Sequence, residues 1–166
     1  MLSPAHSPRR RRQRGNAMVE TALIILPLFA LMFAIIDFSL AIFVKSTLQH
    51  AVREGVRYAV TFQTQPGFCH DDSIKNVVVH NSLNFLRSEQ NREKIQIRYF
   101  LPDTLSPSGN NNPGNIVEVS VEGYSWGWIA PLWRTNTPLS MLVRSSDRME
   151  GLPGGSSPPC RTGSPS

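Results

Sequence analysis

The chain has 166 residues, of which 40% are hydrophobic, and a formal net charge of +5. This length allows at most one soluble domain with appendages, which excludes a multidomain architecture. Residues 1–15 hold five of the 17 Lys and Arg residues and no acid, while the rest of the chain balances 12 basic against 12 acidic residues. The excess charge therefore belongs to the N-terminus. It comes with no recognition fold or aromatic interleaving, so we expect no nucleic-acid partner.

Residues 1–15 are predicted to form a basic, cytoplasmic leader that ends at Gly15. An apolar run follows from Thr21 to Val44, and Asp37 is its only charge. Its 24 residues extend about 36 Å as a helix, enough to cross a hydrocarbon core of about 30 Å. The run is longer than the core of a cleaved secretory signal. Because the arginines precede the span, we expect a single-pass protein of a bacterial inner membrane, with a cytoplasmic N-terminus and a periplasmic remainder.

One long helix is predicted over residues 16–62, transmembrane over 21–44 and amphipathic beyond. Apolar residues from Leu48 to Val60 recur every three to four positions, which predicts a stripe that packs against a head. Pro27 lies in the first half of the span, where it can kink the helix.

Residues 63–150 are predicted to form a periplasmic α+β head. Asp71, Asp72 or Ser73 offers an N-cap for a second helix over about Ser73–Ser88. Three strands are predicted, with the loop Pro102–Asn115 between the first two: Lys94–Leu101, Ile116–Tyr124 and Leu139–Arg144. One helix against a three-stranded antiparallel sheet buries both apolar faces. Residues 151–166 are rich in Gly, Pro and Ser and are predicted to be disordered.

Several separate motifs between residues 14 and 62 resemble the TadE-like family, the pseudopilins or minor pilins of the tight-adherence (Tad/Flp) pilus system. They are Gly15-Asn16-Ala17-Met18-Val19-Glu20-Thr21-Ala22-Leu23, Leu26-Pro27, Asp37-Phe38 and Arg53-Glu54-Gly55-Val56-Arg57-Tyr58-Ala59. The resemblance implies a non-enzymatic component of pilus assembly that serves adhesion, biofilm formation or secretion. A membrane prepilin peptidase would cut between Gly15 and Asn16. Other pseudopilins and the Tad assembly platform proteins would be its partners.

Each of these candidate residues has a second interpretation. Gly15 has no side chain and so admits a protease closely, but it also suits a linker. Glu20, the fifth residue after the cut, pairs with the freed amine of a neighbouring subunit or is a hydrated acid at a helix N-terminus. Asp37 makes a partner contact or is a solvated interfacial acid. Arg53, Glu54, Gly55, Arg57 and Tyr58 are predicted to make juxtamembrane contacts with lipid or the next subunit, or else to be a solvated face.

Cys69 and Cys160 would both lie in an oxidising compartment, where a disulfide is allowed. Free thiols and an intermolecular disulfide remain alternatives, because Cys160 sits in the Gly/Pro/Ser tail. Cys69, His70, Asp71 and Asp72, with His80, lack zinc-site spacing, so we expect no metal and no cofactor.

The chain contains no catalytic motif, and we expect no small-molecule substrate. Two alternatives to a pseudopilin are a signal-anchored periplasmic enzyme and a tethered binding module. A module would use Trp126, Trp128 and Trp133, although burial of these side chains against the sheet is the favoured interpretation.

Overall fold

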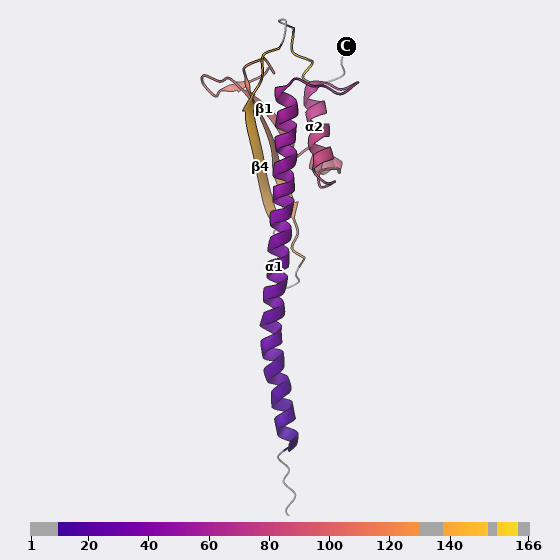
Figure 1. Ribbon diagram of the computed structural model, residues 1–166, viewed down its shortest axis with the longest axis vertical. Coiled ribbons are helices and arrows are strands. Elements are labelled where there is room, and N and C mark those ends of the chain that lie inside the picture. Colours follow the sequence, from indigo (N-terminus) through magenta and orange to yellow (C-terminus); the bar gives the residue numbers. More distant parts are fainter. Residues whose placement is uncertain (1–9, 130–137, 153–155, 163–166) are drawn as a thin grey trace, which may run out of the picture.

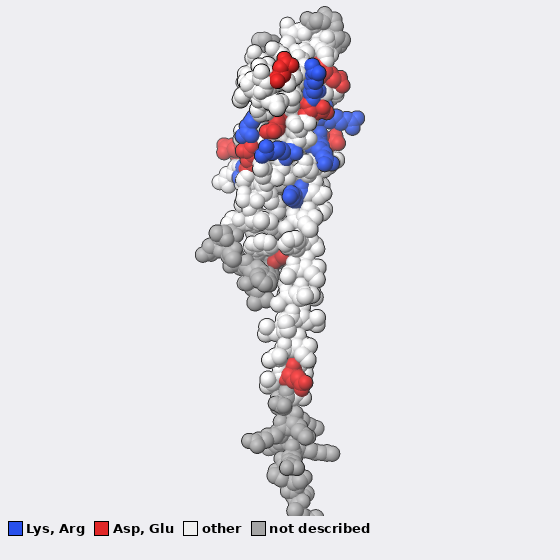
Figure 2. Space-filling view, turned by 90° about the vertical axis from the view of Figure 1, so that its left-hand side faces the viewer, with Lys and Arg blue, Asp and Glu red and all other residues white. Residues whose placement is uncertain are grey.

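A long helix carries a small head on its C-terminal half (Figure 1). The computed structural model describes residues 10–129, 138–152 and 156–162, with side chains from residue 17 onward. Helix α1 (Arg10–Val60) has 51 residues and runs unbroken through Pro27. It begins six residues before the predicted start. On the face in Figure 2, Lys and Arg gather on the head, and the described shaft below it is mostly uncharged.

The head is an α+β unit, as predicted, but its sheet has four strands rather than three. Its elements are α2 (His70–Asn81), α3 (Glu89–Arg92), β1 (Ile95–Phe100), β2 (Pro107–Ser108), β3 (Ile116–Trp126) and β4 (Leu139–Arg148). The strands are antiparallel in the order β2-β1-β3-β4. The extra strand, β2, lies inside the predicted loop Pro102–Asn115. It has only two residues, too few to show an alternating pattern.

Strand β3 contains a β-bulge that changes which side chains of its second half face the core. Val121 pairs with Val143, but the next pair is Tyr124 with Met141, so β3 has one residue more than β4 here. Gly123 sits in the bulge with a φ of 72°, a conformation that glycine adopts readily. As a result Val121 and Tyr124 both face the core, although an unbroken strand would direct them to opposite faces.

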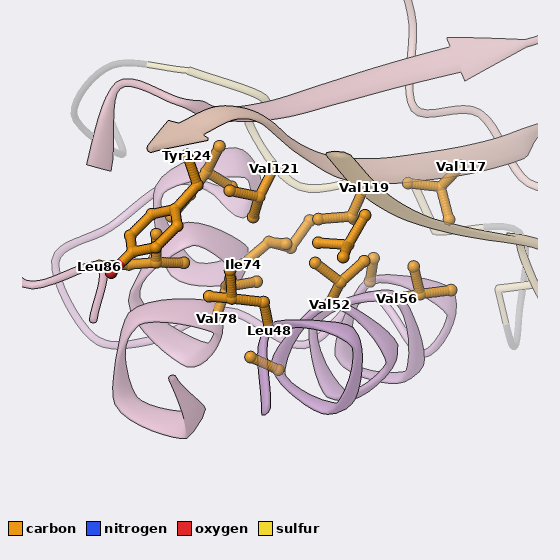
Figure 3. Close-up of a cluster of buried hydrophobic side chains, with 14 of the residues drawn as sticks. Leu48, Val52, Val56, Ile74, Val78, Leu86, Val117, Val119, Val121 and Tyr124 are labelled. Carbon is orange, nitrogen blue, oxygen red and sulfur yellow. The ribbon is translucent and has the colours of Figure 1, made fainter. Parts of the chain in front are cut away.

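The core lies between the sheet and two helices, α1 and α2 (Figure 3). Its centre consists of aliphatic side chains: Leu48, Val52 and Val56 from α1, Ile74 and Val78 from α2, and Val117, Val119 and Val121 from β3. The predicted stripe on the second half of α1 is therefore the face that the head covers.

Helix α2 differs at both ends from the predicted Ser73–Ser88. It ends at Asn81 because Leu83 and Asn84 adopt positive φ angles of 49° and 69°, which a helix does not allow. The Ser82 hydroxyl accepts a hydrogen bond from the Leu86 amide, and this turn directs Leu86 into the core.

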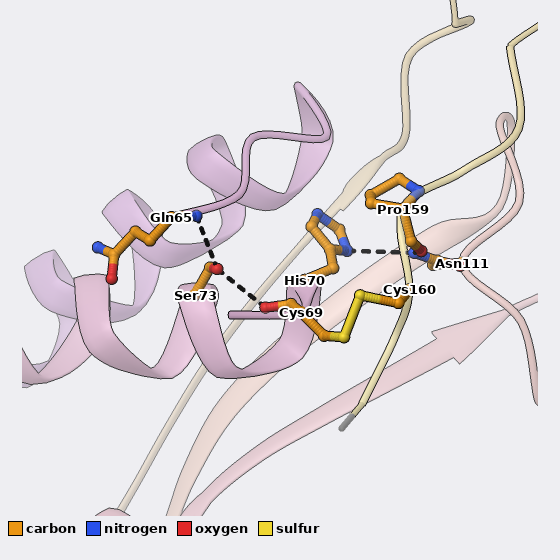
Figure 4. The surroundings of a disulfide bond; sticks show 7 residues. All are labelled: Gln65, Cys69, His70, Ser73, Asn111, Pro159 and Cys160. Carbon is orange, nitrogen blue, oxygen red and sulfur yellow. Dashed lines mark hydrogen bonds between the residues drawn. A yellow bond between two sulfur atoms is a disulfide. The ribbon is translucent and has the colours of Figure 1, made fainter. Parts of the chain in front are cut away.

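The C-terminal tail caps the start of α2 (Figure 4). The amides of His70 and Asp71 donate to the carbonyls of Cys160 and Arg161, at 2.8 and 2.9 Å. These bonds satisfy two of the helix's unpaired N–H groups, so the predicted side-chain caps are not used. The prediction that 151–166 is disordered is therefore wrong for residues 156–162. Residues 153–155 and 163–166 lie outside the described part.

Candidate functional site: the anchor helix and its junction with the head

The lower half of α1 is an exposed apolar shaft. Almost every large apolar side chain from Met18 to Ile36 is exposed, among them Leu23, Leu26, Phe29 and Ile35. A soluble monomer rarely leaves so much contiguous apolar surface in water. In the described part of the chain this is the one helix long and apolar enough to cross a membrane. Because it is not buried, it is not the core helix of a soluble protein.

The predicted processing residues lie at the N-terminal end of this shaft. The backbone of Gly15 and Asn16 is helical, because α1 starts at Arg10. Glu20 is exposed one turn further along, and none of the described side chains pairs with it. Its carboxylate is thus available to a group outside this chain.

Asp37 occupies neither of its two predicted environments. It is 2% exposed, and its Oδ1 accepts a hydrogen bond from the Ile129 amide at 3.1 Å. Ile129 belongs to the segment that follows β3, so the partner of Asp37 is the protein's own head. This contact ties the lower edge of the head to one point on the anchor helix.

The head therefore overlaps the apolar run in which the membrane span was predicted. Ala41 and Val44 are buried, and α1 packs on β4 in this region. The apolar part of α1 below Asp37 is Ala17–Ile36, and its 20 residues extend about 30 Å. That length matches the hydrocarbon thickness of a bilayer.

The predicted juxtamembrane residues lie beside the head instead. Arg53 is 17 residues beyond Ile36, about 25 Å along the helix, and would stand clear of a hydrocarbon region that covers Ala17–Ile36. Arg53 and Arg57 are exposed, whereas Glu54 and Tyr58 are half-buried. Partial burial raises the pKa of Tyr58.

Gly55 is a packing residue and cannot contact lipid. It is buried where α1 crosses α2, and a Cβ atom there would overlap the Val78 Cγ2 methyl. Within this predicted group, Arg53 and Arg57 are the side chains that the head leaves exposed.

A disulfide joins Cys69 to Cys160 at the far end of the head, with a Cα–Cα distance of 5.1 Å (Figure 4). A buried polar cluster surrounds it. The Tyr99 hydroxyl donates to Asp71 Oδ1 at 2.7 Å, and Arg161 Nε donates to Asp71 Oδ2 at 3.0 Å. These bonds fix the tail to α2 and β1.

His70 lies at the centre of that cluster and is fully buried. Its ring stacks on Phe62, with 5.7 Å between ring centroids. Burial lowers the pKa of His70, and the Asp71 carboxylate opposes this shift. Its Nε2 has no hydrogen-bond partner among the described residues. The same residues contain no group of three His, Cys, Asp or Glu side chains able to hold a metal.

The predicted tryptophan group is divided. Trp126 is half-buried at the end of β3 and packs on the core. Trp128 lines an apolar groove between α1 and β4. Trp133 lies outside the described residues.

Sequence reasoning did not assign functional roles to Tyr99, Asn111, Arg161 or Ile129, all of which hold the head together through contacts distant in sequence. Asn111 Nδ2, for example, donates to the Pro159 carbonyl at 3.1 Å, across 48 residues. No local pattern marks such a contact.

These features define a protein with one membrane-directed helix that continues into the core of a small α+β head. Residues 15–57 match the model of the TadE-like protein family. The match confirms the resemblance and lies on α1, while the other elements of the head are outside it. It supports a pilin-like protein associated with the Tad pilus, with an N-terminal membrane-anchor helix. Searches of curated proteins and of solved structures found no match.

Proposed function

We propose that this protein is a pseudopilin, a minor component of Tad/Flp pilus assembly, anchored in the bacterial inner membrane and without enzymatic activity. The observation that carries the proposal is the family match over residues 15–57, which runs from the leader junction into the part of α1 that forms the core of the head. Pilus-dependent adhesion, biofilm formation or secretion would be its cellular role.

The leader sets the orientation and is then removed. Five arginines before the apolar run keep the N-terminus cytoplasmic by the positive-inside rule, and the head is then periplasmic. A prepilin peptidase cuts between Gly15 and Asn16. Glycine suits this position because it lets a membrane protease approach the backbone closely.

Cleavage creates a positively charged N-terminal amine, which can neutralise the carboxylate of Glu20. The new Asn16 amine lies four residues before Glu20, about 6 Å along the helix. A carboxylate at the membrane border is costly unless it is paired or hydrated. Glu20 is exposed and pairs with the amine of an adjacent subunit, so that assembly neutralises both charges.

The head then selects neighbours among other pseudopilins and the assembly platform proteins. Because α1 forms the core of the head, contacts made by the anchor and contacts made by the head belong to one rigid body. Arg53 and Arg57 are exposed on the side of α1 that the head leaves uncovered.

Intact-mass spectrometry of the protein purified from membranes tests the proposal. We expect the mass of residues 16–166 when the prepilin peptidase is present and the full-length mass when its gene is deleted. Gly15→Val should block the cut because its side chain occupies the space that the protease needs, whereas the matched variant Asn16→Ser should be cut. A full-length mass in peptidase-positive cells would rule out processing.

A further inference from the structure

The lower edge of the head carries an apolar rim just above the exposed shaft Ala17–Ile36. This rim consists of side chains from α1, from the segment after β3 and from the start of β4: Phe38, Ile42, Trp128, Ile129, Leu139 and Leu142. Phe38 is 64% exposed and Ile129 61% exposed, although neither belongs to the part of α1 below Asp37.

A groove runs along this rim. It has a volume of about 300 Å³ and lies between α1 and β4, with Trp128 in its wall and Lys45 among its lining residues. Phe38 and Ile42 also line a second hollow further down the shaft, together with Leu31 and Ile35. The apolar surface is therefore continuous from the membrane-directed shaft to the groove.

The hydrogen bond between Asp37 and the Ile129 amide fixes the height of the rim. If hydrocarbon covers Ala17–Ile36, the headgroup layer extends about 5–8 Å further, which is some four or five residues of helix. Phe38 and Ile129 lie in that layer, and Ile42, about 9 Å beyond Ile36 along the helix, lies at its outer edge. The long side chain of Lys45 starts just above it and can reach down toward a phosphate.

The order of side chains along the shaft matches a membrane surface. Apolar residues come first, then the groove that Trp128 and Lys45 line, and then Arg53 about two turns above Lys45. Tryptophan favours the headgroup region because its ring is apolar and its N–H is polar. A protein partner would not require this order.

We infer that the rim is a second membrane contact, in which the groove holds an acyl chain of an outer-leaflet phospholipid and Lys45 meets its phosphate. The head thus rests in the bilayer surface. This inference depends on the membrane anchoring proposed above.

Depth-dependent fluorescence quenching tests it on the full chain in phosphatidylcholine–phosphatidylglycerol vesicles. Trp126→Phe with Trp133→Phe leaves Trp128 as the sole tryptophan. We expect lipids brominated near the headgroup to quench most of the Trp128 emission and lipids brominated at the chain end to quench little. A matched control places the sole tryptophan at the far end of the head, as Phe68→Trp with all three natural tryptophans replaced by Phe. We expect no quenching there.

Leu142→Glu provides a second variant, which changes the groove itself. Leu142 is exposed, so the head should keep its fold, but a carboxylate now enters the groove. We expect this change, added to the Trp128-only protein, to reduce quenching by shallow bromine.

Vesicle flotation separates the inference from the proposed anchoring. If the protein does not float with the vesicles, both the membrane anchoring and the lipid contact are wrong. A protein that floats with Trp128 unquenched overturns only the lipid contact. If Trp128 is instead unquenched at low protein density and becomes shielded from aqueous iodide as the density rises, a second copy occupies the groove and the inference is wrong.

Discussion

The close approach of α1 and α2 at Gly55 makes a quantitative prediction about the stability of the head. A Cβ atom at Gly55 would overlap Val78 Cγ2 and would come within 3.7 Å of Ile74 Cγ2. Valine in a helix is nearly restricted to one χ1 rotamer, so Val78 cannot swing its methyl aside. Gly55→Ala therefore forces the helices apart or strains Val78.

Two effects oppose each other in Gly55→Ala. Overpacking costs about 1–3 kcal/mol. Alanine regains about 0.8–1.0 kcal/mol through its higher helix propensity. We expect a net loss of up to about 2 kcal/mol in the free energy of unfolding.

A double-mutant cycle with Val78→Ala isolates the contact. Val78→Ala alone should cost about 2 kcal/mol, since two buried methyl groups are lost at about 0.8 kcal/mol each and a cavity remains. In the double variant the methyl group introduced by Gly55→Ala enters that space. We expect a favourable coupling energy of at least about 1 kcal/mol.

The assay is urea unfolding of the full chain in detergent micelles, followed by near-ultraviolet circular dichroism of the packed aromatic residues. Gly127→Ala is the matched control, because no atom lies within 4 Å of a Cβ there, and we expect a change within about 0.5 kcal/mol. Additive costs in the cycle, within about 0.5 kcal/mol, would refute the close approach of the two helices at Gly55.

Three further predictions concern assembly, the disulfide and pH. Glu20→Ala should still be cleaved and inserted but should give no pili by electron microscopy, and normal piliation would exclude the pairing. Cys160→Ser should lower the stability of the head by roughly 2–5 kcal/mol, because the disulfide closes a loop across a sequence separation of 91, and reductant should have the same effect on the wild type only. Burial lowers the pKa of His70, so the unfolded chain binds the extra proton, and stability should fall as the pH drops below about 6.5. His70→Gln should remove most of that dependence and the exposed His80→Gln should not, as denaturation series across pH would measure.

Elements whose signal is local were predictable from the sequence. The stripe on α1 and the alternation of Val117, Val119 and Val121 depend on neighbours within a few residues, and the structure places these side chains in the core. The bulge had a weaker local signal, Gly123 within a strand pattern, which typically marks such a site.

The ordered tail could not be predicted because its order comes from elsewhere in the chain. Its composition is that of a disordered segment, rich in Gly, Pro and Ser. Three contacts fix the tail. They are the disulfide to Cys69, the hydrogen bonds that two amides of α2 donate to carbonyls of the tail, and the hydrogen bond from Arg161 to Asp71. The composition of a segment indicates only whether that segment can bury enough apolar surface by itself. This tail is ordered instead because it caps the start of α2, a helix distant in sequence.

The position of Asp37 was misjudged for a similar reason. Its place near the end of the apolar run made lipid, water or another subunit the obvious surroundings, because nothing in the local sequence places Ile129 beside it. Because of that contact, the apolar run from Thr21 to Val44 divides into two parts with different surroundings. The lower part is exposed on all sides, whereas Ala41 and Val44 already belong to the core of the head. Because α1 continues through both parts without a break, any displacement of the anchor along its axis must move the head by the same amount. In the proposed pilus assembly, the anchor helix would therefore fix the height at which the head meets its neighbours.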